Sequence, residues 1–283
     1  MITFKTLSSG ITILTLSNNY ATAEVSLYAA QVLSFKPKNK NDILFVSKKS
    51  LYTPGKAIRG GIPVCWPWFG PHATEKDFPV HGFVRTAQWR LAGMEENSKG
   101  TMVTLECSSS PETKKFWNHD FTLSLTVSVG KNLELKLTTK NDGSESVSIT
   151  DAFHTYYRIS EIANVSVRGF DGTRYIDRVG ERTEKTQEGN IVISGETDRV
   201  YLGGEKCVVS DPSAKRTVTV KKDGFPDTIV WNPWIDRSKA MVDFDDDEYR
   251  NMICVEAGSA LDNKIALAPG ASVTQKMTIV PRG

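Results

Sequence analysis

The sequence has no apolar run long enough to span a membrane. Its first twenty residues also lack a basic segment followed by an apolar stretch and a small-residue cleavage site, which is the pattern of a secretory signal. These two absences argue against an integral helical membrane protein and against a secreted one. We therefore expect a cytoplasmic protein with no membrane partner.

Cysteine is scarce, and no two cysteines lie close together in the chain. The four cysteines occur in no CxxC spacing; they are Cys65, Cys107, Cys207 and Cys254. This spacing argues against a dense disulfide framework and against a zinc site. We expect four reduced, buried thiols, and we expect the protein to use no metal and no other cofactor.

An excess of charge of one sign is also absent. Lysine and arginine together number 35 and aspartate and glutamate 33, so the formal net charge is only +2. A nucleic-acid-binding surface usually carries a larger basic excess, so we expect no nucleic-acid partner. Any site for an anionic ligand must therefore be built locally.

Helical periodicity is almost missing from the chain. Only residues 110–117, with Pro111 early and two lysines late, are typical of a short helix. No alternation of strands with helices appears, and no repeat or Pro/Gly/Ser linker marks a domain boundary. The residues 1–283 are therefore expected to form one domain.

Alternation with a period of two dominates instead. Residues 121–129 place an apolar side chain at every second position, and residues 133–138 do the same after a Gly-Lys-Asn break, which predicts a β-hairpin. Further strands are expected at residues 24–35, 43–46, 102–107, 147–149, 165–167, 218–220, 228–231, 252–256 and 273–280. Many strands at modest spacing predict an all-β sandwich or barrel.

The segment 57–71 gathers glycines, prolines and aromatic residues around one arginine, Arg59, and predicts an ordered loop. The Arg59 guanidinium can clamp an anion, although a surface ion pair is the commoner role of an arginine. Trp66, Trp68 and Phe69 can stack on a sugar ring or simply pack beneath the loop. The residues themselves leave both alternatives open.

A second candidate group begins at His81, four residues before Arg85. If this stretch is extended, His81, Phe83 and Arg85 share one face. A lone histidine is usually structural, so the pair only suggests a site.

A stronger pair consists of His154 and Glu256. Strand alternation places His154 next to Tyr156 in an otherwise apolar segment, and Glu256 ends an apolar strand whose two faces both look buried. A buried carboxylate must be paired, protonated or functional, and burial raises its pKa toward the range of a general base near neutral pH. The alternative is a glutamate at a strand end that reaches solvent.

The acidic run of residues 243–248 lacks the ligand spacing of an EF-hand. We expect it to be a solvated acidic loop rather than a calcium site.

These segments together resemble the glucose-6-phosphate 1-epimerases, the hexose-6-phosphate mutarotase branch of the aldose 1-epimerase family. The likeness extends over nearly the whole chain, through the ordered blocks AIRGGIPVCWPWFG, HGFVRTAQW, ETKKFWNHDFTL, DAFHTYY, ETDRVY, WNPWIDRSKAMVDFDDDEY and MICVEAG. It implies a galactose-mutarotase-like β-supersandwich. It also implies roles for six residues: His154 as general acid, Glu256 as general base, Arg59, Arg85 and Asp198 as substrate contacts, and His81 as a second active-site histidine.

The resemblance implies a hexose 6-phosphate as substrate and an acid–base reaction. Glu256 would remove the proton of the anomeric hydroxyl while protonated His154 gives one to the ring oxygen, after which the open aldehyde rotates and closes on its other face. Two other functions stay open: a mutarotase for unphosphorylated aldoses, and a carbohydrate-binding protein without turnover. We expect a monomer.

Overall fold

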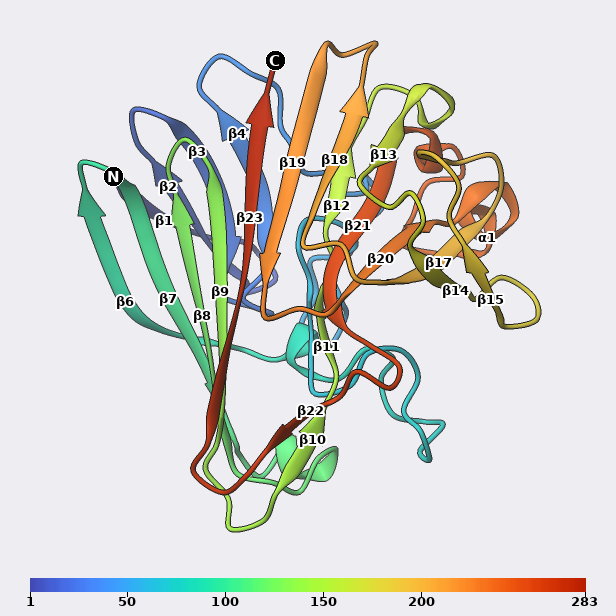
Figure 1. Ribbon diagram of the computed structural model, residues 1–283. Coiled ribbons are helices and arrows are strands. Elements are labelled where there is room, and N and C mark those ends of the chain that lie inside the picture. Colours follow the sequence, from blue (N-terminus) through green and yellow to red (C-terminus); the bar gives the residue numbers. More distant parts are fainter.

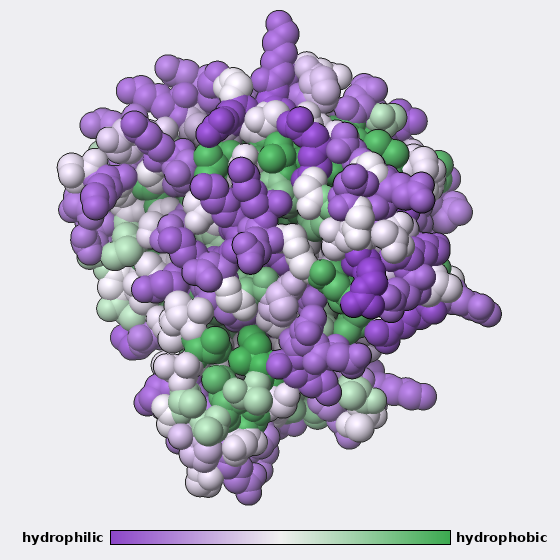
Figure 2. Space-filling view, in the orientation of Figure 1, coloured by the Kyte–Doolittle hydropathy of each residue, from purple (hydrophilic) through white to green (hydrophobic).

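The computed structural model describes residues 1–283 and contains 23 strands but only one α-helix, so the all-β fold expected from the alternating pattern is confirmed. Two large antiparallel sheets form most of the molecule (Figure 1). No helix is both long enough and apolar enough to cross a membrane. In Figure 2, hydrophilic side chains cover most of the visible face, with hydrophobic side chains in small separate patches.

The larger sheet has nine strands and contains the predicted hairpin. β8 pairs with β9 in the register Val129↔Leu133, and the alternate residues of both strands are buried, as the pattern predicts. In spatial order the strands are β16 (Ile191–Val192), β13 (Ser166–Arg168), β18 (Lys206–Asp211), β19 (Arg216–Asp223), β23 (Ser272–Arg282), β9 (Leu133–Asn141), β8 (Phe121–Val129), β7 (Gly100–Ser108) and β6 (Arg90–Asn97).

The eight-stranded sheet carries the buried strands. All eight residues of β21 and all six of β20 are buried, because both faces of these strands are covered. In spatial order the strands are β15 (Thr183–Thr186), β14 (Arg174–Asp177), β17 (Thr197–Leu202), β20 (Asp227–Asn232), β21 (Met252–Ser259), β11 (Asp151–Phe153) and β5 (Val64–Cys65), with β12 (Tyr156–Arg158) also paired to β21.

Two small sheets complete the fold. The four-stranded sheet consists of β1 (Ile2–Thr6), β2 (Thr12–Ser17), β3 (Ala21–Ser26) and β4 (Val32–Pro37), and its β2 and β3 contact β7 and β8 of the large sheet. The other pairs β10 (Val147–Ile149) with β22 (Ile265–Leu267). A continuous core of 58 buried residues, from Leu14 to Ile279, packs between the sheets. All four cysteines are free and buried, as expected.

Three local predictions were wrong. Residues 24–35 form parts of two strands, because the chain turns between β3 and β4 at Ala29 and Ala30, whose φ angles are positive. Residues 43–46 make isolated bridges rather than a strand. The expected helix at 110–117 is a single 3₁₀ turn, η2 (Thr113–Lys115).

The one α-helix was not predicted. It is α1 (Trp234–Ala240), whose first residue, Trp234, has φ of 56° and donates its backbone N–H to Asn232 Oδ1. The remaining 3₁₀ turns are η1 (Val84–Thr86), η3 (Ile162–Asn164) and η4 (Glu248–Asn251). Both α1 and η1 contribute residues to the cavity described next.

Candidate active site

One cavity of about 380 Å³ brings together all six residues that the sequence analysis singled out. They are Arg59, His81, Arg85, His154, Asp198 and Glu256. The register of the eight-stranded sheet builds its floor, because Tyr156, Cys254, Trp231 and Asp198 lie opposite one another on β12, β21, β20 and β17. Three strand spacings, or about 14 Å, therefore separate the Tyr156 end of this row from the Asp198 end.

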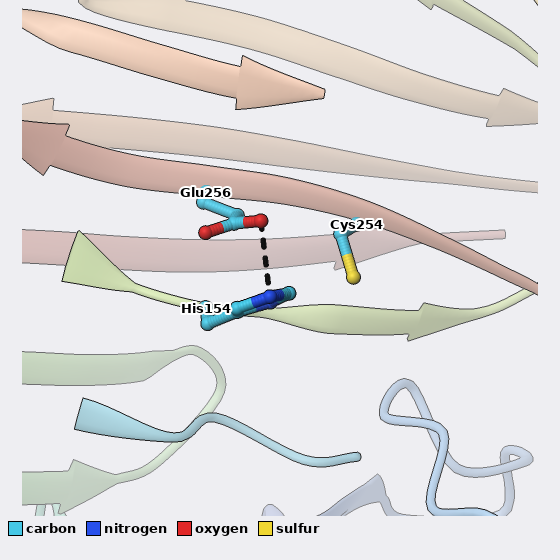
Figure 3. A group of neighbouring side chains, drawn as sticks. All are labelled: His154, Cys254 and Glu256. Atoms are coloured by element: carbon cyan, nitrogen blue, oxygen red, sulfur yellow. Dashed lines mark ion pairs between the residues drawn. The ribbon is translucent and has the colours of Figure 1, made fainter. Parts of the chain in front are cut away.

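His154 and Glu256 meet at the middle of this floor (Figure 3). Glu256 belongs to β21, and His154 follows β11, whose residue Phe153 lies opposite Ala257. His154 Nδ1 lies 3.2 Å from Glu256 Oε1, yet neither Nδ1 nor Glu256 Oε2 makes a hydrogen bond. His154 is 7% exposed and Glu256 1% exposed, so both residues are buried. The two atoms without a hydrogen bond are free to bind a ligand.

The surroundings of this pair favour its neutral form. The pKa of Glu256 is raised well above its ordinary value by burial and then by the charge of Asp198, as the sequence analysis expects. The pKa of His154 is lowered well below its ordinary value by burial and then by the charges of Arg85 and Arg59. Both directions disfavour the ion pair, so the protonated His154 of the sequence analysis is not the favoured form before a ligand binds.

Arg59 is held at one end of the floor by two partners. Its Nε and Nη2 lie 3.2 and 3.1 Å from the same Asp243 carboxylate oxygen, and its Nη1 donates to the Tyr156 hydroxyl at 3.1 Å. Asp243 opens the acidic run that we expected to be a solvated loop. That prediction was wrong for two residues of the run. Asp243 binds Arg59, and Glu248 is buried and accepts hydrogen bonds from the Lys48 and Asp245 backbone N–H groups.

Arg85 has no such partner. It lies in η1, lines the cavity, and makes neither an ion pair nor a side-chain hydrogen bond. Its pKa is lowered first by burial and, among nearby charges, by that of Arg59, so the two guanidinium groups repel each other. A half-buried cation without a counter-ion, next to a second cation, is a ready site for an anion.

His81 reaches the cavity by a route that the sequence analysis did not foresee. The segment is not extended: His81 has φ of 67° and Gly82 of 73°, and a Cβ on Gly82 would lie 1.9 Å from the Trp66 carbonyl oxygen. His81 Nδ1 accepts a hydrogen bond from Gly70 N–H at 3.0 Å, which assigns the ring proton to Nε2. Burial and the charge of Arg85 lower the pKa of His81, so it is a neutral donor.

The loop aromatics do not all lie in the same surroundings. Trp66 and Trp68 belong to the hydrophobic core, whereas Phe69 lines the cavity with its ring centroid 4.7 Å from that of His81. Trp231 also lines the cavity and contacts the His154 ring edge-on at 5.8 Å.

Asp198 forms the other end of the floor with an arginine that the sequence analysis missed. Arg178 Nη1 lies 3.8 Å from Asp198 Oδ1, and its guanidinium stands over the Phe69 ring. Burial raises the pKa of Asp198, while Arg178 and Arg237 oppose that rise. Both arginines line the cavity; Arg237 stands in one of the segments that carry the family resemblance, whereas Arg178 stands in none.

Cys254 completes the group drawn in Figure 3. Ligand atoms of His154, Cys254 and Glu256 lie within 4.8 Å of one another, as in a metal site. However, burial raises the pKa of the Cys254 thiol well above its ordinary value, so the thiolate that a metal requires is disfavoured. The absence of a metal remains a prediction.

The cavity of this β-sandwich contains a buried acid–base pair and an arginine without a counter-ion. Together these features define an acid–base site for an anionic ligand. Comparison with known proteins identifies the family: the chain belongs to the aldose 1-epimerase family, whose model, "Aldose 1-epimerase", matches residues 12–280. An Escherichia coli protein named "Putative glucose-6-phosphate 1-epimerase" is 38% identical over 263 residues, which are 92% of this chain and 87% of that protein.

Solved structures agree. A "putative mutarotase" from Salmonella typhimurium is 33% identical with a TM-score of 0.93, covering 99% of this chain and 93% of that one. A "galactose mutarotase-like protein" from Clostridium acetobutylicum is 18% identical with a TM-score of 0.77, covering 100% and 98%. The expected galactose-mutarotase-like fold is thereby confirmed.

Proposed function

We propose that this protein is a hexose-6-phosphate mutarotase that interconverts the α and β anomers of glucose 6-phosphate. One observation carries the proposal: the buried pair His154–Glu256 shares a cavity with Arg85, a cation without a counter-ion. A neutral sugar can accept hydrogen bonds from a guanidinium but does not compensate its charge, whereas a phosphate dianion does both. The names of the relatives support the same substrate class.

The reaction needs one proton removed from the anomeric hydroxyl and one given to the ring oxygen. Glu256 and His154 exchange these roles as the ring opens and closes, and each contributes on the order of 10²- to 10⁴-fold. Asp198 and the Nε2–H of His81 hold ring hydroxyls, which keeps the open aldehyde in place while its C1–C2 bond rotates.

Substrate binding itself would prepare the pair. Arg85 and Arg59 lower the pKa of His154 through their charges. A bound phosphate dianion compensates those charges, so the pKa of His154 rises and the shared proton moves from Glu256 toward His154. The carboxylate then serves as the base and the imidazolium as the acid, which are the roles that the resemblance implies.

Anomer-exchange NMR tests the proposal. Purified protein should accelerate exchange of glucose 6-phosphate well above the spontaneous rate and exchange free glucose far more slowly. Equal acceleration for both sugars would indicate an aldose mutarotase without phosphate selectivity. No acceleration of either would indicate a binding protein.

A further inference from the structure

A second polar hollow lies on the nine-stranded sheet, and it shares no residue with the cavity described above. It encloses about 280 Å³, and four cations surround it: Arg168, Lys206, Lys221 and Arg282. They stand on β13, β18, β19 and β23, which lie side by side (Figure 1). All four are exposed, and we call this site the basic hollow.

The floor of the basic hollow is uncharged. The other lining residues are Val208, Thr217, Thr219 and Val280, and no carboxylate is among them. These residues share one face of the sheet, because the intervening residues Cys207, Val209, Val218, Val220 and Ile279 are buried in the core.

The four cations are left without counter-ions. None makes an ion pair within 4.0 Å, whereas Lys276 and Lys140 of the same sheet bind Glu134 and Asp142 at 2.8 and 2.6 Å. The nearest acidic position along the same face, Asp223, lies two residues beyond Lys221 and opposite Lys276.

Two of the cations also oppose each other directly. Lys206 and Lys221 are register partners on β18 and β19. Like charges placed opposite each other on neighbouring strands destabilise a sheet, and the arrangement is relieved when an anion binds between them.

The spacing of the cations selects the kind of anion. Arg168 lies opposite Val208 and Arg282 opposite Thr217. At about 4.8 Å per strand and about 3.3 Å per residue, Arg168 and Arg282 are ~14 Å apart across the strands, and Lys221 and Arg282 are ~13 Å apart along them. A single phosphate would require all four side chains to converge on one point and concentrate their mutual repulsion there, whereas a chain of phosphoryl groups distributes its charges along the same spread.

We propose that the basic hollow binds an oligophosphate chain of about three phosphoryl groups. Such a chain occurs both in a nucleoside triphosphate and in inorganic tripolyphosphate, and the chemistry that the hollow recognises is common to both. The lysine and arginine side chains contact the phosphoryl oxygens, and the threonine hydroxyls of the floor can donate to them.

Calorimetric titration of the full chain with tripolyphosphate at low salt tests the proposal. The double variant Lys206→Ser/Lys221→Ser should bind at least about tenfold more weakly, since two charge-assisted contacts are lost. The matched control Lys140→Ser/Lys276→Ser removes the same charge from the same sheet but from ion-paired positions, and its affinity should change less than about twofold. Equal weakening in both double variants would overturn the proposal, because it would show only a response to net charge.

A second arm separates the hollow from the active-site cavity. Arg85→Ala should leave tripolyphosphate binding unchanged, and loss of binding in that variant would place the anion in the cavity and refute the proposal. ATP that binds as tightly as tripolyphosphate supports recognition of the chain alone, and tighter binding of ATP supports a nucleotide as ligand. Thermal unfolding checks that the variant is folded. The Lys206→Ser/Lys221→Ser variant should melt at the same temperature as wild type or higher, because it loses a repulsive pair.

Discussion

Substitution of Glu256 by glutamine should change how stability depends on pH. In the folded protein the pKa of Glu256 is raised well above its ordinary value of 4.5, so the side chain keeps its proton, whereas in the unfolded chain it ionises. The folded state then binds one more proton than the unfolded state above pH 4.5. Its free energy of unfolding therefore falls as pH rises through this window, by about 1.4 kcal/mol per pH unit for this group.

Glutamine has no proton to lose, and its amide N–H can still face His154 Nδ1 as the protonated carboxyl does. His154 and Glu256 titrate together, so the comparison reports on the pair rather than on Glu256 alone. As pH rises from 5 to 7 the wild type should therefore lose stability relative to Glu256→Gln, by up to about 1.4 kcal/mol per pH unit.

Urea unfolding of both proteins at pH 5, 6, 7 and 8 measures this difference. Asp151→Asn serves as a positive control, because burial raises the pKa of Asp151 to about 7. The free energy of unfolding of the wild type minus that of Asp151→Asn should fall from pH 4 to pH 7 and then level off. A difference between wild type and Glu256→Gln that stays constant within about 0.5 kcal/mol would refute the reasoning. It would mean that Glu256 is ionised in the folded protein as it is in the unfolded chain.

Four further predictions concern catalysis. Arg85→Ala should lower kcat/KM for glucose 6-phosphate by roughly 10- to 150-fold, since a charge-assisted contact to phosphate contributes on the order of 1.5 to 3 kcal/mol. The same substitution should leave kcat/KM for glucose almost unchanged. A parallel fall for both sugars would contradict the phosphate role. Asp243→Ala should raise KM for the 6-phosphate by less than Arg59→Ala does, because Arg59 loses the carboxylate that holds it but keeps Tyr156; an unchanged KM would show that Arg59 needs no positioning. His154→Asn should abolish measurable anomer exchange without unfolding the protein, because an amide cannot supply a proton. Retained exchange with a lowered melting temperature would assign His154 a structural role instead. Treatment with EDTA should leave the exchange rate unchanged, and a loss restored by a divalent ion would redirect attention to the group of His154, Cys254 and Glu256.

Strands were predicted well where a single face is buried. β8 and β9 alternate strictly, because each has one side in the core and one in solvent. The limits of β8 and the start of β9 were predicted to the residue, whereas β9 continues to Asn141, beyond its predicted end at residue 138. The prediction failed at residues 24–35 and at 110–117, where a turn with positive φ at Ala29 and Ala30 and a single 3₁₀ turn break patterns that continue through them. Local sequence does not report such interruptions, because they depend on what packs against the turn.

The candidate site was predicted in its members but not in its connections. The blocks of the family resemblance identified all six residues that the structure brings into one cavity. They did not reveal that Asp243 holds Arg59 across 184 positions of sequence, or that Arg178 faces Asp198. The first contact joins two loops and the second joins a loop to β17, and no spacing in the chain encodes either meeting.

The amino-acid sequence by itself therefore determined the all-β class, because hydrophobic alternation is a local property, and the family resemblance pointed to His154 and Glu256 as the acid–base pair. Tertiary structure alone decided where the charges and protons reside. Whether His154 is neutral or protonated depends on burial and on Arg59 and Arg85, which come from other segments. Electrostatic energies depend on distance and desolvation in the folded chain, and neither quantity exists until the sheets have packed.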